Sequence, residues 1–152
     1  LEHYFAVVIP VSEGGSDKTK ADLADFNRQF FASANLKVTS NLLDRENQLV
    51  LVKAFPRKDR AMDYYKVLTA NRESMIDLNT SGFRMFVIHT ENYVELFKGK
   101  DIEGYGQFFD ALYLRDCSTA RTEHHGTQPQ RWHRPRHQPD RGGHPRRRVH
   151  PQ

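Results

Sequence analysis

The sequence predicts an α+β domain over residues 1–115, followed by a tail over residues 116–152 that stays disordered. Three observations lead to this prediction. Short apolar, β-branched runs alternate with segments whose apolar residues recur at helical spacing. Polar stretches rich in turn-forming residues separate these runs. The composition then changes abruptly after Arg115.

The first strand is expected over residues 4–11, where YFAVVIPV is an almost continuous apolar run, as in a strand covered on both faces. The polar stretch at 12–17 predicts a loop, and a helix is expected over about 19–34. Thr19 followed by Asp22 resembles a capping box with a shorter acid. The apolar stripe of this helix consists of Leu23, Phe26, Phe30 and Phe31.

Two further strands are expected at 36–43 and 48–55, with the polar turn DREN between them. The short turn predicts that they form a hairpin. Pro56 ends the second of these strands and opens the next helix, where its missing N–H costs nothing. The stripe of this helix is expected at Ala61, Tyr64, Tyr65 and Leu68, and it continues loosely to Met75 and Ile76.

A turn at 79–82 leads into the fourth strand at 83–90, and residues 91–100 predict a short helix or loop that carries Tyr93 and Phe97. Asp101 is expected to cap a last helix. The order strand, helix, strand, strand, helix, strand predicts a ferredoxin-like fold, an antiparallel four-stranded sheet with two helices on one face. The additional C-terminal helix would close an end or the open face, and its apolar stripe is Ile102, Tyr105, Phe108, Phe109 and Leu112.

The net charge of +4 is unevenly distributed along the chain. Residues 1–115 hold 15 Lys and Arg against 16 Asp and Glu, whereas residues 116–152 hold 8 Arg against 3 acids. The domain therefore has no basic character of the kind that nucleic-acid binding requires. RNA-binding domains with this order of elements carry a glycine and inner aromatic residues in the equivalent strand, and QLVLVKAF lacks both, so no nucleic-acid partner is expected for the domain.

The tail contains 6 His, 5 Pro and no Lys, and Trp132 and Val149 are its only sizeable apolar residues. It has too little apolar surface to offset the entropy of ordering, which predicts disorder. Three interpretations compete: an Arg-rich nucleic-acid arm, a His-rich metal tract, and a GC-rich gene translated out of frame. The histidines considered for a metal tract match no zinc spacing; they are His124, His125, His133, His137 and His144. We favour the frameshift or expression artefact, because Arg, His, Pro, Gln and Gly without Lys is the composition that a GC-rich gene gives when it is translated out of frame.

Few residues of the domain suggest chemistry. His3 and His89 are its only histidines, and His89 is expected to be a satisfied histidine within a strand. No Ser or Cys is positioned to pair with it, and the single Cys117 lies at the junction with the tail. Gly14 and Gly15 precede Lys18, but the spacing of a phosphate-binding loop is absent.

The acidic residues of the helices are expected to be solvated, since none forms an evident acid–base pair. They are Asp22, Asp25, Asp59, Asp63 and Asp110. We therefore expect no catalytic, cofactor-binding or metal-binding residue, and a protein that is not an enzyme. No run of 18 apolar residues is present, so no transmembrane helix is expected. Leu1 leads directly into an apolar run, which suggests a piece of a longer protein.

Several segments resemble one family. They are HYF near the start, DFN at 25–27, VKAF at 52–55 with AMDYY at 61–65, FVI at 86–88 with ENY at 91–93, and KDI at 100–102 with the aromatic residues at 105, 108 and 109. Together they are similar to the C-terminal domain of Bacteroidetes tetratricopeptide-repeat lipoproteins of the PorW/SprE type, which serve gliding motility and type IX secretion. The similarity covers about residues 3–114 and contains no catalytic signature.

This resemblance implies a scaffold or protein-interaction domain of the cell envelope, on the periplasmic side of the outer membrane. It implies helical repeats and a lipid anchor outside this chain, with protein partners in the envelope. The spacing after Phe55 also resembles peptidoglycan-binding domains of the SPOR type, which is one alternative. A second alternative is an ACT-like regulatory domain that binds a small molecule through Gly14 and Gly15.

Overall fold

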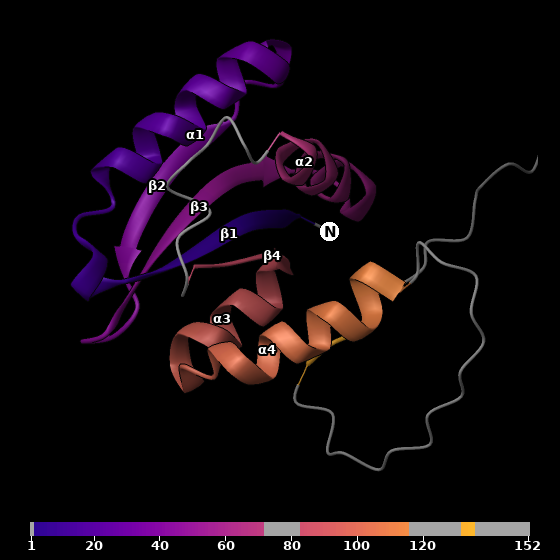
Figure 1. The fold of residues 1–152 in the computed structure, drawn as a ribbon. Helices are drawn as coiled ribbons and strands as arrows, with labels where there is room; N and C mark the ends of the chain where they lie inside the picture. Colours follow the sequence, from indigo (N-terminus) through magenta and orange to yellow (C-terminus); the bar gives the residue numbers. More distant parts are fainter. Residues whose placement is uncertain (1, 72–82, 116–131, 136–152) are drawn as a thin grey trace, which may run out of the picture.

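The computed structural model describes residues 2–71, 83–115 and 132–135. Within them the chain forms one mixed unit of strands and helices (Figure 1). The elements are β1 (His3–Pro10), α1 (Asp17–Phe30), β2 (Lys37–Leu42), β3 (Asn47–Phe55), α2 (Lys58–Ala70), β4 (Arg84–His89), α3 (Thr90–Gly99) and α4 (Ile102–Phe109), with short turns of 3₁₀-helix at Val11–Glu13 and Ala32–Ala34 and a π-helical turn at Asp110–Leu114.

The strands of the described residues form one antiparallel sheet in the order β2-β3-β1-β4. β1 is central and pairs with β3 on one side and with β4 on the other. β2 pairs with β3 through a hairpin and lies at one edge. The predicted α+β class is therefore confirmed. The predicted hairpin of the second and third strands is also present.

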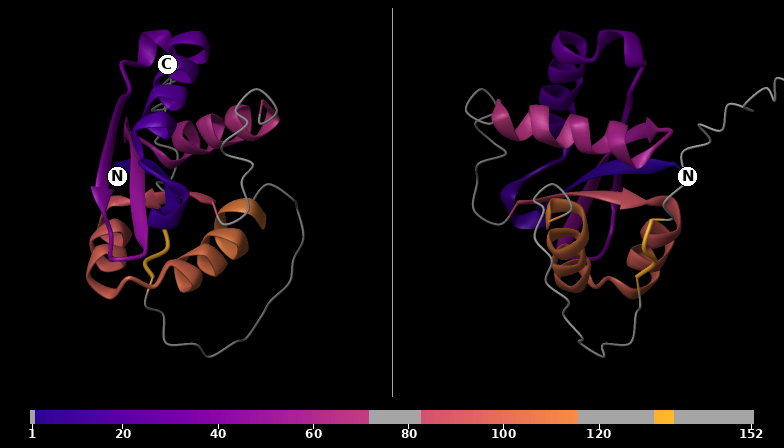
Figure 2. Two further views of the ribbon diagram at one scale, coloured as in Figure 1. Left: turned by 60° about the vertical axis from the view of Figure 1, so that its left-hand side comes forward. Right: turned by 90° about the vertical axis from the view of Figure 1, so that its right-hand side faces the viewer.

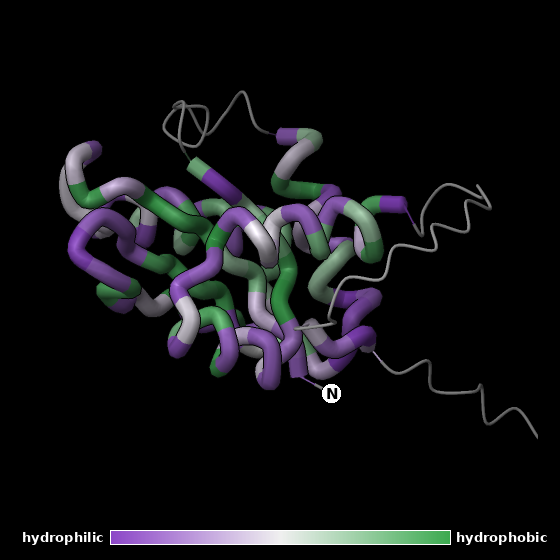
Figure 3. Tube along the Cα trace, turned by 90° about the horizontal axis from the view of Figure 1, so that it is seen from below, coloured by the Kyte–Doolittle hydropathy of each residue, from purple (hydrophilic) through white to green (hydrophobic). Residues whose placement is uncertain are grey.

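The helices lie on both sides of the sheet (Figures 1 and 2). α1 and α2 cover one face, where Tyr64 of α2 packs its ring 5.1 Å from that of Phe5. α3 and α4 lie on the opposite side, where Tyr105 of α4 packs 4.8 Å from Phe86. Because successive strand residues point to opposite faces, β1 and β4 bury side chains in both layers. This arrangement explains the nearly continuous apolar run of β1, and hydrophobic stretches accordingly run through the centre of the trace (Figure 3).

The α4 layer also engages β4 directly. The Tyr105 hydroxyl donates a hydrogen bond of 2.7 Å to the Val87 carbonyl of β4. Arg84 of the same strand forms an ion pair of 2.9 Å with Glu103. β4 is thus packed against a helix at its side of the sheet, whereas β2 at the other edge pairs with β3 and with no second strand among the described residues.

Two details of α1 differ from the prediction. The helix begins at Asp17 after Ser16, and Thr19 is a buried residue within it, so the proposed capping box at Thr19 is wrong. The helix ends at Phe30 rather than Ala34, because the backbone leaves helical geometry at Phe31 and reaches a left-handed conformation at Asn35. Phe30, predicted as part of the apolar stripe, is 41% exposed.

The other predicted helices agree more closely with the structure. Asp101 caps α4 as expected, since its Oδ1 accepts a hydrogen bond of 2.9 Å from the Gly104 N–H. Residues 91–100, left open between helix and loop, belong mainly to α3. The predicted extension to Met75 and Ile76 and the turn at 79–82 lie outside the described residues.

Two residues of the tail, Trp132 and His133, make contacts with α3 and α4. Trp132 is buried with its ring 5.0 Å from Tyr105 and 6.3 Å from Phe108. The Asn92 side chain donates to the His133 carbonyl and accepts from the His133 N–H, both at 3.0 Å. Disorder was expected throughout 116–152, and residues 132–135 are the part of this range that the structure describes.

Candidate functional site

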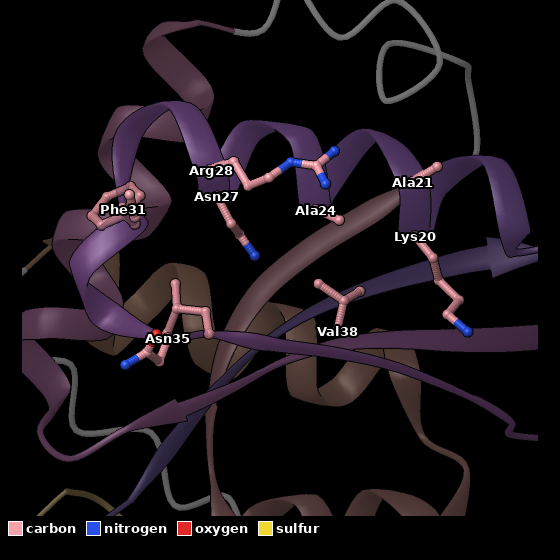
Figure 4. A pocket seen from close by; sticks show the side chains of 10 residues that line it. Lys20, Ala21, Ala24, Asn27, Arg28, Phe31, Asn35 and Val38 are labelled. Carbon is pink, nitrogen blue, oxygen red and sulfur yellow. The ribbon is translucent and has the colours of Figure 1, made fainter.

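An open cleft of about 470 Å³ lies between α1 and the edge strand β2 (Figure 4). One wall is a stripe of α1 at helical spacing, which contains Lys20, Ala24, Asn27 and Arg28. Val38 of β2 contributes to the opposite wall. The volume falls within the range of about 300–1,000 Å³ typical of ligand sites.

Asn27 is the polar group at the inner wall of this cleft, and it is only 6% exposed. Its Oδ1 accepts a hydrogen bond of 2.6 Å from the Tyr64 hydroxyl, which fixes the orientation of the amide. Its Nδ2 has no hydrogen-bond partner among the described residues. Figure 4 shows this nitrogen directed into the space between α1 and β2. The site therefore presents a buried donor that nothing in the described chain satisfies.

The charges that line the cleft are all positive. Lys20 and Arg28 are its charged residues, and the lining contains no carboxylate. Arg28 pairs with Asp25 one turn earlier on α1, but both side chains are largely exposed, at 77% and 66%. A surface pair of this kind contributes little and exchanges readily with other partners. The cleft is suited to an oxygen-rich, negatively charged group.

The lining also determines what the cleft can do chemically. Within the described residues the lining contains no Ser, Cys, His, Asp or Glu side chain, and Lys20 is the one side chain there that could act as a nucleophile or general base. A donor amide and two cations can hold an anion or a carbonyl oxygen.

Sequence reasoning did not identify Asn27. The predicted apolar stripe of α1 includes Leu23 and Phe30. Asn27 lies four residues after Leu23 and three before Phe30, so it falls on the same face of the helix. An amide inside an apolar stripe is the signal that points to a buried polar group. Its partner Tyr64 lies 37 residues away, and only the packing of α1 against α2 brings the two together.

The two histidines of the domain do come together, and neither lines the cleft. The centroids of the His3 and His89 rings lie 5.2 Å apart, and Tyr113 packs edge-on against His3 with ring centroids 6.1 Å apart. His3 Nε2 lies 3.2 Å from the Tyr113 hydroxyl. His89 Nδ1 accepts from the Glu91 N–H at 3.3 Å and so caps α3.

His89 was expected to be a strand residue whose ring nitrogens have hydrogen-bond partners, and this holds for one of the two nitrogens. Its Nδ1 is satisfied, but its buried Nε2 has no partner among the described residues. Burial lowers the pKa of His89, and the nearby Glu91 carboxylate opposes that shift. The neutral ring is therefore favoured, with its proton on Nε2.

The glycine loop does not form a phosphate site. Gly14 adopts a φ of 97°, and its carbonyl accepts from Gln48 Nε2 at 3.3 Å. Thr19 is buried in α1, and neither glycine lines the cleft. Gly14 is required here for its positive φ at the turn into α1.

Of the acidic residues considered from the sequence, Asp22 and Asp25 belong to α1, Asp59 and Asp63 to α2, and Asp110 to the π-helical turn after α4. Asp25 pairs with Arg28, and Asp59 lies 3.1 Å from Arg57. Asp63 and Asp110 are exposed on their helices. The described residues contain no group of three or more His, Cys, Asp or Glu side chains placed to hold a metal ion. Of the tail histidines considered as ligands, His133 alone falls within the described ranges.

No helix within the described ranges has the length and apolar character needed to cross a bilayer. Comparisons with protein-family models, with curated proteins and with solved structures found no match to this chain.

Proposed function

We propose that this chain is a non-enzymatic protein-interaction domain that accepts an extended segment of a partner as an additional strand beside β2. The observation that carries the proposal is the difference between the two edges of the sheet. β4 is packed against α4 through Tyr105 and Glu103, whereas β3 is the only strand that pairs with β2 in the described chain, so the outer edge of β2 has no strand beside it. An edge strand presents backbone donors and acceptors that an added strand can pair with.

The topology supports a finer description of the fold. Starting from β4, the strand order is β4-β1-β3-β2, and α1 and α2 connect strands that run in the same direction on either side of a central strand. We propose that the domain is ferredoxin-like with an added α3–α4 layer. This order is what two interleaved strand–helix–strand units produce.

The family resemblance suggests where such a domain acts. The similarity to PorW/SprE-type lipoproteins suggests a cell-envelope protein of gliding motility or type IX secretion, on the periplasmic side of the outer membrane. A lipid anchor and helical repeats would lie in other parts of that protein. The partner strand would then belong to another component of the secretion machinery.

The alternatives receive less support from the geometry. Binding of peptidoglycan in the SPOR manner calls for an open sheet face, and α3 and α4 lie against that face, where Tyr93 packs on Tyr4 at 5.5 Å. Binding of a small molecule through Gly14 and Gly15 calls for a cavity at that loop, and the cleft lies between α1 and β2.

The edge can be tested with a neutral probe. The ¹⁵N-labelled full chain is titrated with the capped pentapeptide Ac-TVQVT-NH2, and backbone amide shifts are followed by NMR. We expect saturable shifts at Lys37–Leu42, with an affinity of roughly millimolar for so short a strand, while the amides of Arg84–His89 stay in place. Unmoved β2 amides at saturating peptide would contradict the strand-addition model.

The cellular setting needs a separate test. The chain, immobilised and incubated with solubilised envelope from a gliding Bacteroidetes species, is expected to retain a type IX secretion component. Recovery of no such component would count against the setting and would leave the β2 edge as it stands.

A further inference from the structure

We infer that the cleft between α1 and β2 is a carboxylate-binding subsite, which takes an acidic side chain of the strand that adds to β2. This inference rests on the proposed function, and it specifies the chemistry of the partner segment. It combines the open strand edge with the unsatisfied Asn27 amide and the two cations of the cleft.

The geometry connects the edge to the cleft. Val38 of β2 points toward α1, and it faces the same side of the sheet as Val52 and Phe5 through the pairing register. A strand paired with β2 places every second side chain on that same side. One of these side chains therefore lies at the mouth of the cleft, below the Lys20–Arg28 stripe.

Asn27 sets the chemistry of the inner wall. Because Tyr64 donates to Oδ1, the amide shows its N–H₂ group to the cleft, and this group can only donate. A guest therefore needs an acceptor oxygen. Nδ2 is oriented by a buried partner before any ligand arrives, which reduces the entropy lost on binding.

The cations select a carboxylate over a neutral acceptor. Lys20 and Arg28 lie on either side of Asn27 along α1. Arg28 can exchange its exposed partner Asp25 for an incoming carboxylate, because an ion pair at the surface is weak.

The same charges argue against two other occupants. A second copy of this chain paired through β2 would bring two sets of these cations together, which like-charge repulsion disfavours. The tail, with 8 Arg against 3 acids, has the same sign of charge as the cleft. An acidic segment of a partner protein is the occupant that complements it.

Small side chains keep the cleft open. Ala21, Ala24 and Ala32 contribute to its lining where larger residues would fill it. The volume of about 470 Å³ exceeds one side chain, so a Glu side chain and its hydration water both fit. Ala24→Leu is thus a variant that blocks the cleft while retaining a strong helix former in α1.

The test compares Ac-TVEVT-NH2 with its Gln counterpart on the ¹⁵N-labelled full chain at low salt. The readouts are the backbone amides of β2 and the side-chain N–H₂ resonance of Asn27. We expect the Glu peptide to move both and to bind about tenfold more tightly than the Gln peptide. Asn27→Asp keeps the acceptor for Tyr64 and removes the donor, so the preference for Glu should be lost.

Two further variants cover the case in which Asn27→Asp fails to fold. Lys20→Gln should reduce the preference for the Glu peptide, whereas Lys66→Gln, which removes an exposed charge from α2, should not. Ala24→Leu should abolish the shift of the Asn27 N–H₂ resonance. Amide dispersion in the free protein reports whether each variant is folded.

The outcomes separate the subsite from the strand edge. Equal binding of the two peptides at β2, with Asn27 unmoved, would overturn the carboxylate subsite and leave strand addition in place. Absence of β2 shifts with either peptide would overturn both. If sodium acetate shifts the Asn27 N–H₂ resonance as strongly as the Glu peptide does, the bound carboxylate need not belong to a peptide, and the assignment to a partner strand would be overturned. If the free chain sediments as a dimer in which β2 is already paired with β2 of a second copy, the proposal that the added strand comes from a different protein would be overturned.

Discussion

His89 shows how one buried ring serves two elements at once. It ends β4 and, through Nδ1, accepts the first free N–H of α3 from Glu91. This bond requires the neutral tautomer with the proton on Nε2, which is buried without a partner in the described chain. Protonation would cancel the Nδ1 acceptor and add a buried charge, so the lowered pKa of His89 follows from its surroundings.

The pH dependence of stability follows with a definite sign. Because the pKa of His89 is lower in the folded state than the unfolded value of about 6.5, the unfolded state binds the extra proton more readily. The contribution of His89 is fully present above that unfolded pKa and is lost as the pH falls toward the folded value. The groups near the ring are His3, Glu91 and His133.

His89→Asn should remove this acid sensitivity. Asn retains an acceptor for the Glu91 N–H, and it is a favoured N-cap residue. We expect the free energy of unfolding in urea to fall less between pH 7.5 and 5.5 in the variant than in the parent. The comparison variant is His133→Gln, which removes an exposed imidazole whose charge contributes to the lowered pKa of His89, so it should reduce the pH slope less than His89→Asn does. An unchanged pH slope in His89→Asn would contradict the assignment.

At the scale of single residues, the sequence predicted the cap at Asp101 and missed the amide at Asn27. A cap is a local pattern, in which an acid precedes a helix by a fixed number of residues. The environment of Asn27 depends on Tyr64, which is distant in sequence and reaches it through tertiary packing. Spacing along one helix cannot reveal such a partner.

The α4 helix illustrates a conflict between propensity and capping within one element. Gly104 lies in its first turn, where alanine would stabilise a helix by up to about 1 kcal/mol. A Cβ on Gly104, however, would lie 2.2 Å from Asp101 Oδ2, the side chain that caps this helix. Glycine at this position makes room for the cap.

A double-mutant cycle tests this conflict. Gly104→Ala should bring no gain in stability, or a loss of about 1 kcal/mol, because it displaces the Asp101 cap. In an Asp101→Ala background, the same substitution should stabilise by about 0.5–1 kcal/mol. The measurement is urea unfolding of the four proteins. Additive effects, with no coupling between the two positions, would show that the cap and the glycine are independent.

The elements themselves were predicted well, and their ends less well. The apolar runs predicted all the described strands, because a strand that is buried on both faces is a short, continuous run of apolar residues that is easily recognised in a sequence. The end of α1 was placed four residues too late, since Phe31 is apolar and continues the stripe while its backbone has already left the helix. The Phe31 ring packs 5.0 Å from Tyr64 of α2, a contact between distant parts of the chain that the spacing along α1 does not reveal.

At the scale of the molecule, residues 132–135 bind the chain's end to the α3–α4 layer. Asn92 makes the two 3.0 Å hydrogen bonds to His133 that a neighbouring strand would make, and Trp132 packs on Tyr105. Composition alone predicted disorder here, because it averages over 37 residues and hides one well-placed aromatic ring. The α+β class, in contrast, was visible from the order of the apolar runs.

Asn92→Ala should release this contact. Trp132 is the only tryptophan of the chain, so its emission reports on this contact alone. We expect a shift to longer wavelength and greater quenching by acrylamide in the variant, because the ring becomes exposed to water. Gln107→Ala, at an exposed position of α4, serves as the control and should leave the spectrum unchanged. An identical spectrum for Asn92→Ala would contradict the role of the amide.

The hydrogen bond from the Tyr105 hydroxyl to the Val87 carbonyl of β4 bears on how many partner strands the sheet can accept. A sheet that extends from molecule to molecule needs two open strand edges on each subunit, one for pairing with the preceding molecule and one for pairing with the next. Because α4 packs against β4, β2 is the one strand edge that remains open within the described residues. We therefore expect backbone pairing to add a single partner strand per domain, so that the native state offers no route to an extended polymer of the amyloid type.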